Sequence, residues 1–170
     1  MPMSPGVRKF ALTVHVAASV GWVGAVVAYI PFDVTTRVAQ DAETLRAAYF
    51  GIELVAEWAI VPLAWAALVT GLVMSLGTSW GLFRHYWVLV SLVLTAFSVT
   101  ILTIEMHTIR YLADAAADPA TSIDALRALP STLGHSVGGL VVLLVINGLN
   151  IYKPRGLTRY GWRKRQEDPP

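Results

Sequence analysis

Four histidines and three glutamates are the side chains most capable of chemistry in an otherwise apolar chain. They are His15, His85, His107 and His135, with Glu53, Glu57 and Glu105. Each lies within or near the end of a long uncharged run, and an ionisable side chain at membrane depth indicates function because its burial in lipid is costly. Imidazole and carboxylate groups bind haem iron and other metal ions, so these residues predict a metal or haem centre. For Glu53 and His85 we favour the simpler interpretation, an interfacial position near water.

The first apolar run holds the most informative spacing. Residues 10–32 carry no charge, and at about 1.5 Å per residue they can cross a hydrocarbon core of about 30 Å. His15 lies roughly two turns inside this run, and Trp22 follows seven residues later on the same helix face. Gly21 and Gly24 flank the tryptophan, which favours close approach of a helix beside a large planar group. Ordinary helix packing is the alternative explanation of this motif.

The composition is that of an integral membrane protein. Of the 170 residues, 55% are hydrophobic and 14% are charged, with a mean hydropathy of +0.58. The absence of cysteine excludes disulfides, thiolate metal sites and thiol redox chemistry. The excess of basic residues behind the net charge of +2 lies in residues 153–170, and basic residues beside a span are first of all a topology signal. We therefore expect no nucleic-acid partner.

Four apolar runs predict an all-α fold, a four-transmembrane-helix bundle in which residues 1–170 form a single membrane domain. The expected spans are residues 10–32, 52–76, 87–112 and 133–152, followed by a basic tail, residues 153–170. Pro31 should end the first span and Pro62 should kink the second. The segments 33–51 and 113–130 should be polar loops. Because Lys and Arg gather at the chain ends and in the second connection, both termini should be cytoplasmic, in the inner membrane of a bacterium.

Helix geometry sorts the polar side chains into two layers, one per leaflet. In the outer layer His107 and His135 stand at similar depth on neighbouring spans, and they could ligate one haem iron from both faces. Together with outer carboxylates they could instead hold one or two non-haem metal ions. These carboxylates are Glu53, Glu57 and Glu105. Glu105 and His107 are two residues apart and face different ways on a straight helix, which favours haem over a compact metal cage.

The inner layer is built around His15. Met74 lies one turn inside the same boundary on the second span, and His85 lies at that boundary. Either side chain would complete a haem ligand pair with His15, and Trp22 could pack on the ring face. The two layers together predict one or two b-type haems, with a non-haem metal ion as the alternative.

Two longer segments carry a family resemblance. Residues 70–90 and 152–162 resemble a bacterial family of four-span membrane proteins of unknown function. More remotely, His15 and Trp22 with Gly24 resemble the first-helix motif of the haem-containing membrane protoporphyrinogen oxidase and of the copper-resistance D-type proteins. This resemblance implies haem at His15. Ser91 and Leu92 replace the lysine–leucine pair of the oxidase family, so it does not extend to the oxidase activity.

The function expected from these residues is that of a b-type haem protein of the membrane, in electron transfer or in redox or ligand sensing. If it is an enzyme, it should be a haem oxidoreductase. Transport or handling of copper or another divalent ion through His15 and Met74 is one alternative, although four methionines and no cysteine provide poorly for Cu(I). A non-catalytic membrane scaffold that packs through glycine faces is another. Expected partners are the lipid bilayer and a second copy of the chain or a redox partner protein.

Overall fold

The computed structural model describes residues 3–78 and 81–167, and its long elements are all helices. The elements are α1 (Pro5–Val38), α2 (Ala42–Val55), the π-helix η1 (Ala56–Ile60), α3 (Val61–Gly77), α4 (Tyr86–Ala117), α5 (Ile123–Arg127), α6 (Leu133–Tyr152) and α7 (Arg159–Glu167). Because α2, η1 and α3 run on as one helix, the described residues form four helices that are long and apolar enough to cross a membrane. The predicted four-helix bundle is confirmed, and the protein is a multi-pass membrane protein.

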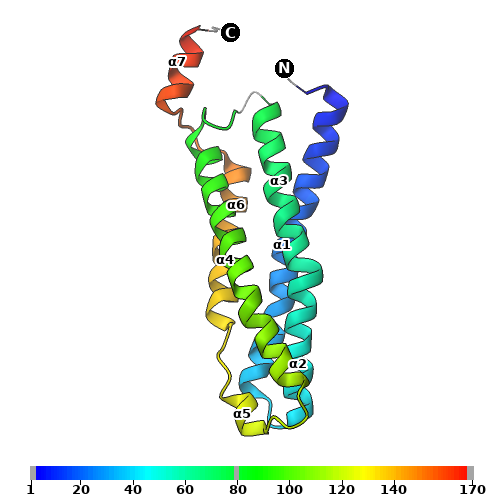
Figure 1. Cartoon of the computed structure of the whole chain (residues 1–170). Helices are drawn as coiled ribbons and strands as arrows, with labels where there is room; N and C mark the ends of the chain where they lie inside the picture. Colours follow the sequence, from blue (N-terminus) through cyan, green and yellow to red (C-terminus); the bar gives the residue numbers. More distant parts are fainter. Residues whose placement is uncertain (1–2, 79–80, 168–170) are drawn as a thin grey trace.

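The bundle has two distinct ends (Figure 1). The start of α1 and the helix α7 lie at one end, as an even number of spans requires, and α5 closes the other. α1 and α4 each pack against α2, α3 and α6. With 34 residues α1 is about 51 Å long, whereas α6 with 20 residues is about 30 Å long. The α5 end is therefore built without α6.

The prediction that Pro31 ends the first span is wrong, because α1 continues to Val38. Proline lacks only the N–H that would bind the carbonyl four residues back, that of Val27, and membrane helices tolerate this loss. Beyond Pro31 the helix has a side-chain hydrogen bond as well, because the hydroxyl of Thr35 donates to the Pro31 carbonyl at 2.8 Å. Asp33 was expected to begin the polar loop after the first span. Its side chain is instead 1% exposed and buried against α6. The chain therefore has no need to leave the helix there.

The expected loop 33–51 is also mostly helical. The second span, predicted as residues 52–76, is the later part of a helix of 36 residues, Ala42–Gly77. Asp41 begins it, with a carboxylate that accepts a hydrogen bond from the Thr44 amide at 2.8 Å. This bond from the Thr44 amide also lowers the pKa of Asp41. A side-chain cap of this kind stabilises a helix start in water, and the apolar pattern alone does not reveal it.

The distortion expected at Pro62 takes the form of a π-helix. η1 occupies the five residues before α3, and Pro62 sits in the first turn of α3. Proline has no N–H to donate to the carbonyl four residues back, and its ring crowds that carbonyl. At the junction the Val61 N–H donates to the carbonyl of Ala56, five residues back. The wider turn accommodates the missing hydrogen bond.

The α5 end has the best-buried core of the molecule. Leu45, Tyr49, Ile52, Leu112 and Leu126 are each no more than 2% exposed. The Tyr49 hydroxyl donates to the carbonyl of Leu126 in α5 at 3.1 Å. The guanidinium of Arg46 donates to three carbonyls at and beyond the end of α4, those of Ala116, Asp118 and Thr121. These contacts fix α5 and its connections, residues predicted as loop, against α2.

Candidate functional site

Two cavities lie between the four long helices in the described part of the chain. The termini-side cavity, of about 460 Å³, is lined by residues near the start of α1 and α4 and the end of α3 and α6. The α5-side cavity, of about 340 Å³, is lined by the middle of α1 and α4, by η1 and by the start of α6. The sequence-predicted residues are divided between them.

His15 is the candidate ligand of the termini-side cavity. Its Nδ1 lies 3.0 Å from the hydroxyl oxygen of Thr70, and that hydroxyl also lies 2.6 Å from the Ala66 carbonyl. A hydroxyl has one proton, and the carbonyl can only accept, so Thr70 donates to Ala66 and receives the Nδ1–H of His15. The neutral ring then carries its lone pair on Nε2, the nitrogen that binds metals in this tautomer.

Gly71 makes room for this ring. A Cβ at position 71 would lie 3.2 Å from the Cε1 atom of His15, closer than a comfortable carbon–carbon contact. The imidazole therefore packs directly against the backbone of α3. Gly71 and Thr70 of α3 therefore set the position of the ring.

The lining of the termini-side cavity combines a thioether, small polar groups and cations. Met74 of α3 shares it with His15, as predicted, and Arg8 and Lys9 of α1 lie at its border. Ser91 of α4 also lines it, and its hydroxyl is the one buried side-chain oxygen or nitrogen in the described residues that has no hydrogen-bond partner. A buried hydroxyl without a partner indicates a site that a bound group would complete.

Two residues expected near His15 lie elsewhere. Trp22, only 4% exposed, lines the α5-side cavity, so it cannot pack on a ring held by His15 at the other end. Seven residues keep the same helix face but move about 10 Å along the axis, so Trp22 and His15 line different cavities. His85 precedes α4, with its ring centroid 6.4 Å from that of Trp87, and does not line the termini-side cavity.

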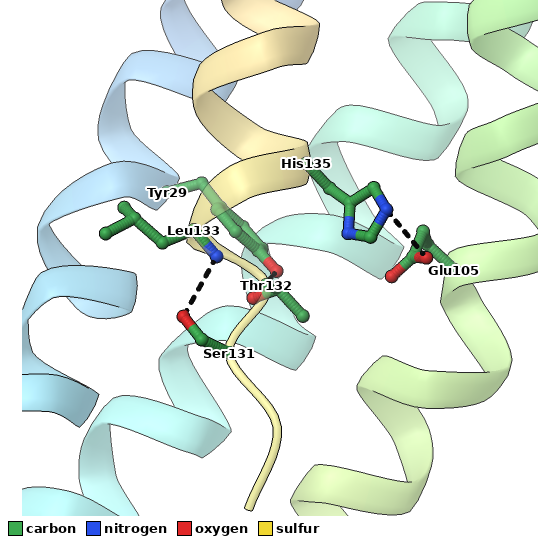
Figure 2. A network of polar contacts seen from close by, with 6 residues as sticks. All are labelled: Tyr29, Glu105, Ser131, Thr132, Leu133 and His135. Atoms are coloured by element: carbon green, nitrogen blue, oxygen red, sulfur yellow. Dashed lines mark hydrogen bonds and ion pairs between the residues drawn. The ribbon is translucent and has the colours of Figure 1, made fainter.

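The structure does not bring His107 and His135 together. Glu105, not His107, faces the start of α6: its Oε1 lies 3.5 Å from Nε2 of His135, and Figure 2 shows the two side chains pointing toward one another. His107 is exposed and lines neither cavity. Two residues on a helix are separated by about 200° of rotation, so only one of Glu105 and His107 can face the bundle.

The other predicted metal ligands are dispersed. Glu57 forms an ion pair with Arg110 at 3.1 Å, with both side chains substantially exposed. Glu53 is half-buried on α2 and lines neither cavity. Across residues 3–78 and 81–167, no three His, Asp or Glu side chains stand close enough to hold a metal ion. The non-haem ligand set therefore lacks the geometry expected of it.

Sequence reasoning missed the most buried carboxylate. Asp33 of α1 accepts hydrogen bonds from the hydroxyls of Thr132, at 2.5 Å, and Ser136, at 2.7 Å, on the first turn of α6. Because Thr132 donates to Asp33, the Tyr29 hydroxyl donates to Thr132, at 3.1 Å. A signal was available: Thr132 and Ser136 are four residues apart, so they present two hydroxyls on one face at the start of an apolar span.

The start of α6 is thus held from three sides. Asp33 and Tyr29 bind it from α1, and Glu105 approaches His135 from α4. The Leu133 N–H at the first position of the helix donates to the Ser131 hydroxyl at 3.3 Å (Figure 2). These bonds place His135 at the edge of the α5-side cavity.

Comparison of the chain with protein-family models, curated proteins and solved structures finds no match. The family resemblances of the sequence therefore stay predictions, and the two cavities are the candidate sites of function.

Proposed function

We propose that this protein binds a b-type haem in the termini-side cavity, with Nε2 of His15 as an axial ligand. The observation that carries the proposal is the 3.0 Å contact between Nδ1 of His15 and the Thr70 hydroxyl, from which the Nδ1–H tautomer is assigned. Histidines that ligate metals nearly always donate their other ring N–H to an oxygen acceptor, which orients the ring and raises the basicity of the ligating nitrogen. Thr70 is such an acceptor, because its own proton is committed to Ala66.

The other lining residues suit the same group. Met74 offers a thioether on the same cavity, and a histidine–methionine pair is an established haem ligation. Arg8 and Lys9 supply cations for the two propionates. The volume of about 460 Å³ lies within the range of cofactor sites. Bound haem would supply one-electron redox chemistry or binding of a small ligand, while this chain positions the iron and neutralises the propionates.

The proposed orientation follows from charge. Arg8, Lys9 and the basic residues after α6 all belong to the termini end, whereas Asp41 and Asp118 belong to the α5 end. Basic residues are retained on the cytoplasmic side of bacterial inner membranes. We therefore place the haem site in the cytoplasmic leaflet of a bacterial inner membrane, within reach of a redox partner protein on that side.

An absorption spectrum tests the proposal directly. Detergent-purified protein, from cells supplied with haem precursor, should show a Soret band and sharp reduced bands after dithionite. His15→Ala should lose the haem, whereas His107→Ala, which alters an exposed histidine, should keep both spectrum and haem content. A colourless wild type, or a His15→Ala variant with an unchanged spectrum, overturns the proposal. A colourless protein with stoichiometric copper by mass spectrometry would instead support metal-ion handling at His15 and Met74.

A further inference from the structure

The α5-side cavity has no part in the proposed haem site. Its walls are apolar and partly aromatic, with Trp22 and Tyr29 from α1 and Phe97 from α4. Aliphatic side chains complete the lining: Val26, Ile60, Ile101, Leu102, Ile109, Val142 and Leu143. A cavity of about 340 Å³ with such walls favours an apolar molecule taken from the bilayer.

Three glycines form the α6 wall of this cavity. They are Gly134, Gly138 and Gly139, and a Cβ built at any of them would meet no described atom within 4 Å. Glycines in membrane helices usually permit close contact with a neighbouring helix, as Gly21 does here, where a Cβ would lie 3.3 Å from Leu63. On α6 no described helix uses the space that the glycines leave. They provide instead a flat wall against which a planar ring can lie.

The polar end of the cavity is the pair of Glu105 and His135. Tyr29, Thr132 and Ser136 also line the cavity, but their hydroxyls are engaged in the hydrogen bonds around Asp33. Glu105 and His135 stand 3.5 Å apart, which is longer than a good hydrogen bond and leaves acceptor capacity on both. A carboxylate beside an imidazole accepts a hydrogen bond from a ligand hydroxyl and suits a ligand whose hydroxyl is acidic.

We propose that the α5-side cavity binds a lipid-soluble molecule whose head is a flat aromatic ring with a hydroxyl group, a quinol or a related phenol. The ring lies along the glycines of α6 and between the aromatic side chains of α1 and α4. Its hydroxyl donates to the Glu105–His135 pair, and an apolar tail extends into the lipid. The inference does not depend on haem at His15, since the two cavities share no lining residue.

Equilibrium binding to the protein in lipid nanodiscs tests this assignment. Ubiquinol-1 is titrated anaerobically by calorimetry, beside its dimethyl ether, which has the same ring but no hydroxyl, and a monohydric alkylphenol. Ubiquinol-1 should bind at least about tenfold more tightly than the ether, because a hydrogen bond to a charged group is lost in the ether. The titration with the alkylphenol shows whether one hydroxyl is enough for binding. If the alkylphenol binds as tightly as ubiquinol-1, the cavity is a site for phenols. If it binds more weakly, the cavity is a site for quinols. Either result supports the proposal.

Two variants locate the binding site. Gly139→Leu fills the cavity and should weaken binding of ubiquinol-1 at least about tenfold. Gly148→Leu is its matched control on the same helix, since a Cβ there also meets no described atom within 4 Å and Gly148 lines neither cavity; its affinity should be unchanged. Glu105→Gln should weaken binding of ubiquinol-1 but not of the ether.

Three results overturn the proposal. Equal binding of ubiquinol-1 and the ether would make the cavity an acyl-chain site of lipid. Unchanged binding in Gly139→Leu would place the ligand elsewhere. If Gly139→Leu does not fold, Glu105→Gln decides alone, because an equal loss for both ligands, or no loss for either, contradicts a hydroxyl contact at Glu105. Haem absorbance is not a readout here, so failure of this proposal leaves the haem proposal standing.

Discussion

The two ends of the bundle are built from the same long helices but differ in how tightly these helices pack. At the α5 end, side chains such as Leu45 and Leu126 are fully buried, and Arg46 ties the end of α4 to α2. At the termini end the four helices leave a cavity of about 460 Å³, and His15 and Met74 are only half-buried. The α5 end extends beyond α6, and its large apolar side chains bury one another. Side chains that face lipid need no such burial, and along the apolar helix Ala42–Gly77 the side chain of Trp58 is 76% exposed.

Stability and ligand binding depend on different ends of the bundle. A tight core resists change because each missing methylene leaves a cavity. An open cavity with a buried polar atom that lacks a partner, such as Ser91, costs stability in the absence of ligand. We therefore expect substitutions at the α5 end to affect folding and substitutions at the termini end to affect binding.

The largest expected effect on stability is at Asp33, which joins α1 to the start of α6. Asp33→Ala removes the acceptor of two buried hydroxyls and should destabilise the protein by about 4 kcal/mol, because hydrogen bonds to a charged group contribute roughly 1.5–3 kcal/mol each. Thermal melting in detergent measures this. Asp114→Ala, which removes an exposed aspartate of α4, should change the melting temperature little. Equal melting of the two variants would show that the Asp33 network does not hold α1 to α6.

The next largest effect should distinguish the core from the cavity. Leu126→Ala at 0% exposure should cost about 3 kcal/mol, near the middle of the usual range for truncating a fully buried leucine. Met74→Ala should cost clearly less in the absence of ligand, because it enlarges a space that already exists. Urea unfolding of both variants in the same detergent measures the difference. A cost for Met74→Ala equal to that for Leu126→Ala would mean that the termini end is as tightly packed as the α5 end.

Two buried serines should respond differently to substitution by alanine, because they differ in their hydrogen bonds. Ser136 donates to Asp33, so Ser136→Ala should destabilise by about 1.5–3 kcal/mol. Ser91 lacks a partner in the described structure, so Ser91→Ala should be neutral or slightly stabilising before haem or another ligand binds. Melting curves of the two variants without ligand check the sign. Destabilisation by Ser91→Ala would mean that its hydroxyl is already satisfied.

The smallest expected effect is a pH dependence at the α5 end. The bond from the Thr44 amide lowers the pKa of Asp41 below its ordinary value of 3.8, so the folded state favours the ionised form. The stabilisation is therefore fully present above about pH 3.8 and is lost as the pH falls through the lowered pKa. Asp41→Ala should lower the melting temperature slightly at pH 7 and not at strongly acidic pH. A difference that persists undiminished at low pH would contradict a contribution from the charge.

The site was only partly accessible from sequence. The sequence placed His15 and Met74 in one layer from their depth on two spans, and both residues line the termini-side cavity. The choice of Glu105 over His107 does not follow, because one residue changes the direction of a side chain by about 100° and the neighbouring helices decide the rotation. Asp33 was assigned to a loop because nothing near it in the sequence indicates its burial. The hydroxyls that bind it are about 100 residues away in the chain.

By itself the sequence determined that four helices cross a membrane, and it placed the last of them at 133–152, as observed. Lipid imposes this, since a backbone in hydrocarbon must satisfy its own hydrogen bonds and an uncharged run of sufficient length has no other stable form. Tertiary structure alone decided that α1 runs past Pro31, that Trp22 and His15 line different cavities, and that α5 closes one end. These features depend on which neighbour offers a partner or leaves a space, and a linear pattern of apolar residues carries no information about that neighbour.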